Sequence, residues 1–236
     1  MKKKIKISIF ADGANLKDII KLNSNPLVKG FTTNPTLMKK NNIKNYKKFA
    51  LKLLSKIKNK PISFEVFADD ISEMRIQAYK IAKWGKNVNV KIPITNTKGI
   101  KTSNLISELT SNKIVCNVTA IFTVSQIKDV LKNIKKNDHI ILSIFAGRIA
   151  DSGIDPEAML RQCKKLLKNY KNAKLLWAST REIFSIIQAE RCGCDIITVP
   201  ENFIKNLNII GKNLNQFSLE TVKMFYSDAK KAGYDI

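Results

Sequence analysis

The sequence has few of the residues that usually mark a metal, redox or dinucleotide site. It holds one histidine, His139, and four cysteines among 236 residues, which is too few for a disulfide scaffold. Only Cys192 and Cys194 are spaced like paired metal ligands, and no second pair accompanies them. No Gly-x-Gly-x-x-Gly occurs, so the dinucleotide-binding loop is absent. A metal or nicotinamide enzyme is therefore not expected.

Long apolar runs are also absent. No stretch approaches the roughly 18 residues that a membrane-spanning helix needs. The first four residues, Met1–Lys4, include three lysines and resemble the start of a secretion signal. The apolar stretch after them is interrupted by Lys6 and ended by Asp12, which makes it too short for such a signal. We expect a cytoplasmic protein with no membrane partner.

Acidic residues are scarce, with 19 Asp and Glu against 42 Lys and Arg, so the formal charge is +23. This charge raises the alternative of a basic nucleic-acid-binding module. Only five of the basic residues are arginine, the residue that reads bases and phosphates with two hydrogen bonds. The lysines are spread evenly from Lys2 to Lys231 and do not cluster with aromatic residues. We expect a solvated basic surface and no nucleic-acid partner.

Eight short apolar runs recur along the chain, with helical patterns between them. Their spacing fits one strand and one crossover helix per unit. The runs are Ile5–Ala11, Gly30–Thr33, Ile62–Phe67, Val88–Ile92, Ile114–Thr119, His139–Phe145, Leu175–Ala178 and Ile196–Val199. The pattern predicts a single (β/α)₈ TIM barrel over residues 1–236, with an additional C-terminal helix over about 219–231. A doubly wound open sheet is the alternative.

One lysine interrupts a strand that is otherwise apolar. Val88, Val90 and Ile92 alternate along this strand and would face the helices, so Asn89 and Lys91 would point into the barrel. A buried lysine is costly unless it is paired or neutral, and the neutral amine is a nucleophile. Among 37 lysines, Lys91 is therefore the candidate for covalent chemistry.

The same alternation places polar residues on the inner face of five further strands. They are Asp12, Thr32, Asn34, Ser63, Glu65, Asn117, Thr119 and Ser143, with Phe145 on the same side as Ser143. Each one alone could be a helix cap or a satisfied core residue. Catalytic groups of such barrels come from the C-terminal ends of several strands. A lysine, two carboxylates, and amides and hydroxyls together suit Schiff-base chemistry on a carbonyl compound.

Two of the five arginines follow strand ends. Arg148 comes after the sixth predicted strand and Arg181 after the seventh. Arginine binds phosphate through two parallel hydrogen bonds, and phosphate sites in these barrels form at the C-terminal strand ends. The two arginines predict a phosphorylated substrate, and pairing with surface carboxylates is the alternative.

Taken together, these stretches resemble the transaldolase family, including its small subfamily that contains fructose-6-phosphate aldolases. The matching motifs run in family order over nearly the whole chain. They are Phe10–Asp12, Thr32–Thr36, Val90–Pro93, Asn117–Phe122, Ser143–Ile149 and Ala178–Arg181. Thr-Thr-Asn-Pro alone would be a weak signal, whereas the joint match is specific.

The resemblance implies an aldol mechanism that uses no metal and no cofactor. Lys91 resembles the lysine that forms a Schiff base with C2 of the donor ketose. Glu65 resembles the carboxylate that shuttles protons through a water, and Thr119 resembles the hydroxyl that holds this water. Asp12 resembles the acid–base group that takes the C4 hydroxyl proton as the C3–C4 bond breaks.

The resemblance also implies the substrate contacts. Asn34, Asn117 and Ser143 resemble the groups that bind the dihydroxyacetone portion, and Arg148 and Arg181 resemble the phosphate clamp. The complete substrate-binding set is expected to be Thr32, Asn34, Asn117, Ser143, Phe145, Arg148, Ser179 and Arg181. Sugar phosphates are the expected partners, and assembly into a homo-oligomer is common in the family.

Two positions distinguish the branches of the family. The aldolase branch typically carries Gln and Tyr where this chain has Glu65 and Phe145, the transaldolase choices. We therefore expect transfer of dihydroxyacetone from sedoheptulose 7-phosphate to glyceraldehyde 3-phosphate, giving erythrose 4-phosphate and fructose 6-phosphate, in the pentose phosphate pathway. An aldolase that releases free dihydroxyacetone is the alternative.

Overall fold

A computed structural model describes residues 5–235, so the basic run at Met1–Lys4 lies outside the described residues. The chain divides into two compact units. The larger one, Lys6–Ile204, contains all eight predicted strands. The smaller one contains the residues from Lys205 onward.

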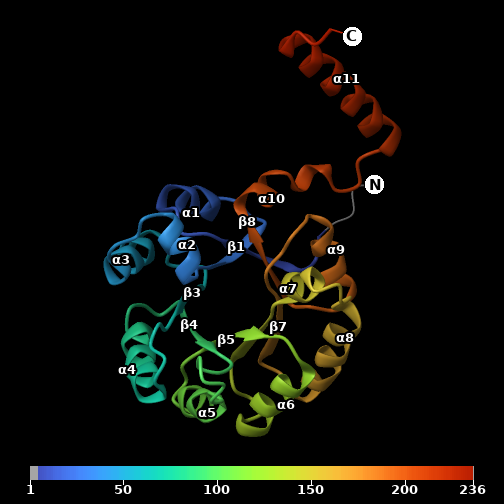
Figure 1. Cartoon of the computed structure of the whole chain (residues 1–236). Helices are drawn as coiled ribbons and strands as arrows, with labels where there is room; N and C mark the ends of the chain where they lie inside the picture. Colours follow the sequence, from blue (N-terminus) through green and yellow to red (C-terminus); the bar gives the residue numbers. More distant parts are fainter. Residues whose placement is uncertain (1–4, 236) are drawn as a thin grey trace. The chain divides into compact units, whose positions relative to one another are not determined.

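The larger unit is a closed barrel of eight parallel strands in the order of the sequence (Figure 1). The strands are β1 (Ser8–Asp12), β2 (Val28–Thr32), β3 (Ile62–Glu65), β4 (Val88–Pro93), β5 (Cys116–Ile121), β6 (Ile140–Ile144), β7 (Ala173–Trp177) and β8 (Ile196–Pro200). Most of their residues are buried, and Ile, Val and Leu dominate β4, β6, β7 and β8, as expected where helices cover the outer face. The predicted TIM barrel is confirmed, and the open sheet is wrong because β1 pairs with β8.

Helices follow the strands and surround the barrel (Figure 1). They are α1 (Leu16–Asn23), α2 (Pro35–Lys40), α3 (Tyr46–Lys56), α4 (Ile71–Ala82), α5 (Ser103–Ser111), α6 (Val124–Asn133), α7 (Ala146–Asp151), α8 (Glu157–Leu166), α9 (Phe184–Arg191) and α10 (Glu201–Lys205). Several begin at a side chain that accepts the first free backbone N–H groups, such as Asn15, Asn45 and Asp70. Each cap fixes the residue at which the preceding loop ends and the helix begins.

The predicted strand ends move by up to three residues. The first strand begins at Ser8 instead of Ile5, because its pairing with β8 starts at Ser8 opposite Ile196. It ends at Asp12, which pairs with Thr32 of β2 and Pro200 of β8. Asp12 therefore belongs to the barrel wall, not to the loop after it.

The barrel interior contains a buried apolar cluster. Phe10, Ile141, Leu176, Ala178 and Ile196 form a buried cluster there, and Phe145 packs against it. Phe10 lies against the backbone of Gly30 on β2, where a Cβ atom would come within 2.6 Å of the Phe10 ring. Glycine at this position lets the Phe10 ring lie directly against the β2 backbone.

The smaller unit contains a short 3₁₀ helix, Leu207–Ile209, and the C-terminal helix α11 (Leu214–Ala232). The predicted C-terminal helix is present and begins five residues earlier than expected. Asn213 caps its first turn, and Gly233 ends it in a left-handed conformation. Within residues 5–235, none of the helices combines the length and the apolar character needed to cross a membrane.

Gly30→Ala tests the packing of the barrel interior. The added methyl group would overlap the Phe10 ring, so we expect a loss of about 1–3 kcal/mol in the free energy of unfolding. Thermal unfolding would measure it. Gly13→Ala is the control, because its Cβ would meet only Ile19, at 3.9 Å. Gly30→Ala combined with Phe10→Leu should regain part of the loss, and equal melting temperatures for Gly30→Ala and Gly13→Ala would contradict this account.

Candidate active site

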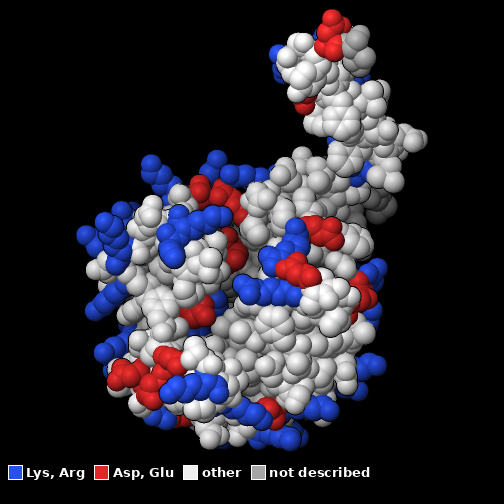
Figure 2. All heavy atoms as spheres, viewed as in Figure 1, with Lys and Arg blue, Asp and Glu red and all other residues white. Residues whose placement is uncertain are grey.

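A cavity of about 400 Å³ opens at the C-terminal ends of the strands. This volume is in the range of small-molecule sites. The cavity brings together all twelve residues that the sequence predicts for the site: Asp12, Thr32, Asn34, Glu65, Lys91, Asn117, Thr119, Ser143, Phe145, Arg148, Ser179 and Arg181. In Figure 2 the barrel is hollowed near its centre, and both basic and acidic side chains lie at the edge of the hollow.

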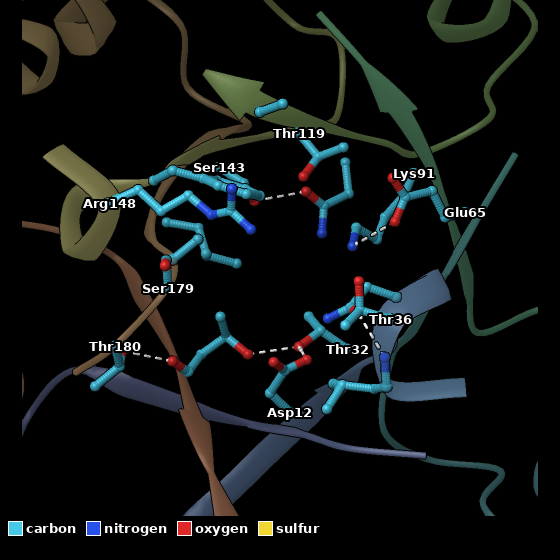
Figure 3. Close-up of a pocket in the computed structure, with 18 of the residues that line it drawn as sticks. Asp12, Thr32, Thr36, Glu65, Lys91, Thr119, Ser143, Arg148, Ser179 and Thr180 are labelled. Carbon is cyan, nitrogen blue, oxygen red and sulfur yellow. Dashed lines mark hydrogen bonds and ion pairs between the residues drawn. The ribbon is translucent and has the colours of Figure 1, made fainter. Parts of the chain in front are cut away.

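Lys91 lies in the wall of the cavity, paired with Glu65 of the neighbouring strand. The two residues are opposite each other in the β3–β4 register, and Lys91 Nζ lies 2.9 Å from Glu65 Oε2 (Figure 3). Lys91 Nζ also donates to the backbone oxygen of Thr33, at 2.9 Å. The side chains are only 9% and 16% exposed, so each charge depends on the other as its counter-ion.

Tyr46 of α3 holds the backbone of Glu65. The β2–β3 ladder contains only two residue pairs and stops at Thr32 opposite Ser63. Beyond it, the Glu65 N–H donates to the Tyr46 oxygen at 2.7 Å, and the Tyr46 hydroxyl donates to the Glu65 carbonyl at 3.1 Å. Burial raises the pKa of Tyr46, so the phenol stays protonated. The Tyr46 side chain thus takes the place of β2 as the hydrogen-bond partner of the Glu65 backbone.

Asp12 faces the same cavity from β1. It accepts a hydrogen bond of 2.8 Å from Thr32 Oγ1 (Figure 3). Burial raises the pKa of Asp12, while the charge of Lys91 and the hydrogen bond from Thr32 oppose this rise. The nearby charge of Glu65 adds to it. A carboxylate with a raised pKa is suited to accept and return a proton.

A chain of hydrogen bonds orients the amide of Asn117. Ser143 Oγ donates to Asn117 Oδ1 at 2.6 Å, and Asn117 Nδ2 lies 3.0 Å from Ser63 Oγ. Asn117 is opposite Lys91 in the β4–β5 register, and Thr119 is opposite Pro93. β5 bends directly afterwards, since Ala120 has a positive φ of 58° and the register with β6 shifts there. Thr119 lies directly before this bend and lines the cavity.

Asn34 has a structural task as well as a place in the cavity. Its Oδ1 accepts the backbone N–H of Leu37 at 2.9 Å and so caps α2, with Pro35 as the first helical residue. The cap uses the amide oxygen, so Nδ2 is the group that can donate a hydrogen bond to a ligand.

Phe145 and the two arginines lie at one side of the cavity. The guanidinium of Arg148 lies over the Phe145 ring at 5.8 Å from its centre. Arg181 is paired with Asp151 of α7, with Nε 2.9 Å from Oδ2. The hydrogen bonds from Arg181 lower the pKa of Asp151, as do the charges of both arginines. Asp151 thus keeps Arg181 beside the helix that carries Arg148.

The first turn of α7, which carries Arg148, touches the backbone of the loop after β7, which carries Arg181. Ser179 has a positive φ of 64°, unusual for a residue other than glycine. A Cβ atom on Gly147 would come within 1.6 Å of the Ser179 backbone oxygen. The start of α7 and the loop after β7 therefore approach each other only because position 147 is glycine.

Several residues of the site have no counterpart among the predicted ones. The cavity is also lined by Thr36, Thr180 and Thr198, and Tyr46 acts from outside it. The strand alternation could have found Thr198, because it is the polar residue in an apolar run. Tyr46 lies on a helix, where no strand pattern could identify it. Within residues 5–235, no three His, Cys, Asp or Glu side chains are grouped as metal ligands.

Asp12→Asn tests the cost of the buried carboxylate. A raised pKa in the folded state means that ionised Asp12 opposes folding at neutral pH. We expect Asp12→Asn to raise the melting temperature at pH 7, at about 2–4 °C per kcal/mol gained. The gain in melting temperature should shrink as the pH falls toward 3.8, the ordinary pKa of Asp. At such a pH the protonated Asp12 is neutral, as the asparagine side chain is.

Thermal unfolding between pH 4 and pH 8 measures this difference. The control is Asp129→Asn, because hydrogen bonding to Lys101 lowers the pKa of this exposed carboxylate. That variant should not be more stable than the parent protein at pH 7. A melting temperature of Asp12→Asn that stays at or below the parent value at every pH would show that Asp12 carries no such cost.

Known proteins resemble this chain in sequence over nearly its whole length. The model of the transaldolase/fructose-6-phosphate aldolase family matches residues 9–236. A probable transaldolase of Nitrosopumilus maritimus is 32% identical over 232 residues, which cover 98% of this chain and 99% of that protein. A probable transaldolase of Dehalococcoides mccartyi is 34% identical over 194 residues, with 81% and 86% covered.

Solved structures match the fold at low sequence identity. A 2,3-dimethylmalate lyase has a TM-score of 0.58 at 11% identity, and the match covers 98% of this chain and 85% of the lyase. A putative lyase/mutase of Burkholderia cenocepacia has a TM-score of 0.59 at 9% identity, with 99% and 87% covered. These two show the barrel fold alone. The sequence matches assign the relationship: the chain belongs to the transaldolase/fructose-6-phosphate aldolase family.

Proposed function

We propose that the chain is a transaldolase that carries a dihydroxyacetone unit on Lys91 between sugar phosphates. The observation that carries the proposal is the buried amine of Lys91, held between Glu65 and the Thr33 carbonyl in a cavity that Asp12 also lines. The donor would be sedoheptulose 7-phosphate and the acceptor glyceraldehyde 3-phosphate, a step of the pentose phosphate pathway.

The first half of the reaction forms and cleaves the Schiff base. Glu65, 2.9 Å from Lys91 Nζ, takes the proton that leaves the amine neutral, and Nζ attacks C2 of the ketose. Loss of water gives an iminium ion, for which Glu65 returns the proton. Asp12 then accepts the C4 hydroxyl proton as the C3–C4 bond breaks, and its raised pKa suits this transfer. The aldose leaves, and the three-carbon unit stays on Lys91 as an enamine.

The second half runs the same steps in reverse with a new aldehyde. The enamine carbon attacks the acceptor carbonyl, Asp12 returns the proton to the new hydroxyl, and water releases the product ketose from Lys91. Asn117 and Ser143 line the cavity near Lys91 and would hold the dihydroxyacetone hydroxyls. Arg148 and Arg181 would bind the phosphate.

Phe145 favours transfer over release. Its ring lies beside Phe122 and under the Arg148 guanidinium, and it carries no hydroxyl that could activate water at the enamine. The enamine should therefore persist until an aldose phosphate arrives. Cytoplasmic localisation and assembly into a homo-oligomer stay predictions from the sequence.

Borohydride trapping tests the nucleophile. Reduction in the presence of fructose 6-phosphate should fix a three-carbon unit to the protein, detectable as a mass increase on the peptide containing Lys91. Lys91→Ala should lose the adduct to background level. Lys174→Ala is the control, since Lys174 is a strand lysine whose side chain is 52% exposed. Full trapping by Lys91→Ala would refute the assignment.

Dependence on an acceptor separates transaldolase from aldolase. With fructose 6-phosphate alone, we expect about one equivalent of glyceraldehyde 3-phosphate per site and no accumulation of dihydroxyacetone. Adding erythrose 4-phosphate should start steady turnover. Phe145→Tyr is the matched variant, because it places a hydroxyl where the parent has none, and it should raise the release of free dihydroxyacetone. Continuous release by the parent protein without an acceptor would instead support the aldolase.

A further inference from the structure

Three threonines from different parts of the barrel lie in a row that ends at Asp12. Thr32 Oγ1 contacts both Asp12 Oδ1 and Thr198 Oγ1, and Thr180 Oγ1 donates to the Thr198 carbonyl at 2.7 Å (Figure 3). Thr198 is 7% exposed and Thr32 is 4% exposed. Their hydroxyls therefore have few partners other than each other and the cavity.

The direction of these hydrogen bonds follows from the number of protons. An ionised carboxylate only accepts, so Thr32 gives its single hydroxyl proton to Asp12, at 2.8 Å. The contact between Thr32 and Thr198 then requires Thr198 to donate and Thr32 to accept. A hydroxyl that accepts a hydrogen bond becomes a better donor. Thr198 thus strengthens the bond that Asp12 receives, although it does not contact Asp12.

The fold holds Thr198 for this contact. The β7–β8 ladder contains two residue pairs and ends at Trp177 opposite Ile197, so the Thr198 carbonyl lies just beyond it. Thr180 supplies the donor that this carbonyl would otherwise lack. On the other side of β8, Thr198 is opposite Phe10 of β1. Both edges of β8 are therefore fixed at this residue.

We propose that Thr198 is a positioning residue for Asp12, acting through Thr32 to stabilise the ionised carboxylate that begins bond cleavage. This role rests on the proposed function, in which Asp12 must start as a base. It is confined to the residues of β1, β2 and β8 and requires no ligand.

Other charged groups act on Asp12 from several elements. Lys91 of β4 favours its ionised form, and Glu65 of β3 opposes it. Asp18 of α1 and Glu201 of α10 line a smaller cavity that Asp12 also borders. Arg148 and Arg181 line the main cavity. A test must therefore isolate the titration of Asp12 from that of its neighbours.

The experiment compares melting temperatures with and without Asp12→Asn as a function of pH, first in the parent protein and then in Thr198→Val. The difference within each pair follows the titration of Asp12, because all other groups are common to the pair. Without the Thr198 hydroxyl, we expect this titration to move to higher pH by roughly half a pH unit. A shift of this size corresponds to a fraction of the free energy of one hydrogen bond. Thr198→Ser keeps a hydroxyl and should leave the titration at the parent pH. If Thr198→Val does not fold, Thr198→Ala replaces it.

Thr110→Val is the matched control. Thr110 is 2% exposed, and its hydroxyl donates to another carboxylate, that of Asp138 on the outer side of the barrel. This variant can lower the melting temperature, but it should not move the Asp12 titration. An unmoved titration in Thr198→Val, or an equal shift in Thr110→Val, would overturn the proposal.

A kinetic measurement connects the proposal with the reaction. The acid limb of kcat/KM should move upward in Thr198→Val, in the direction of the stability titration, and return in Thr198→Ser. An acid limb that stays in place while the stability titration moves would overturn the role of Thr198 in catalysis. Absence of aldol activity in the parent protein, with the stability titration moved, would refute the proposed function and leave the hydrogen-bond relay standing.

Discussion

The buried ion pair between Lys91 and Glu65 is the interaction on which the site depends. An unpaired ammonium group in the barrel interior would cost several kcal/mol, and Glu65 removes that cost only if it stays beside the amine. The β3–β4 register places the two residues opposite each other, and Tyr46 fixes the Glu65 backbone where the β2–β3 ladder has already ended. Among the described residues, Lys91 is the only buried lysine on a strand. A shift of the β3–β4 register would take Glu65 away from it, so the barrel has to keep its register at this point.

Next to this pair, an apolar cluster adjoins a rim of unusual backbone conformations. Phe10 and its apolar neighbours fill part of the barrel interior, and two of them, Leu176 and Ala178, also line the cavity. At the C-terminal ends of the strands, the backbone has a positive φ at Ala120 and Ser179 and a contact at Gly147 that leaves no room for a Cβ atom. Such conformations cost free energy and persist where the surrounding structure enforces them. The apolar cluster includes Ala178, directly before Ser179, and so supports the rim at that point.

The strand alternation, with its period of two, predicted most of the cavity wall. Lys91, Glu65 and Asn117 stand out because each is polar at an inward position of an apolar strand, and the eight repeats predict that these positions converge. The same rule applied to Ile196–Pro200 would have indicated Thr198, but one threonine in a strand is unremarkable without its partners. Tyr46 and Asp151 act from helices on Glu65 and Arg181, and such contacts depend on helix placement. The left-handed backbone at position 179 could not be predicted, because the residue is serine and not glycine. This conformation depends on the close approach of Gly147 to the Ser179 backbone.

The distribution of charge inside the cavity explains how a sugar phosphate would be oriented. One side of the cavity holds two carboxylates, Asp12 and Glu65, with the single ammonium of Lys91. Arg148 enters the cavity from the side opposite Lys91 and Glu65 (Figure 3), and with Arg181 it faces one carboxylate, Asp151. An anionic phosphate is repelled from the first group and attracted to the second, whereas the uncharged ketose end can approach Lys91 without penalty. The overall charge of +23 attracts such an anion from any direction and does not orient it. The separation of carboxylates from guanidinium groups orients the anion, because it acts at short range inside the cavity, where water screens charges least.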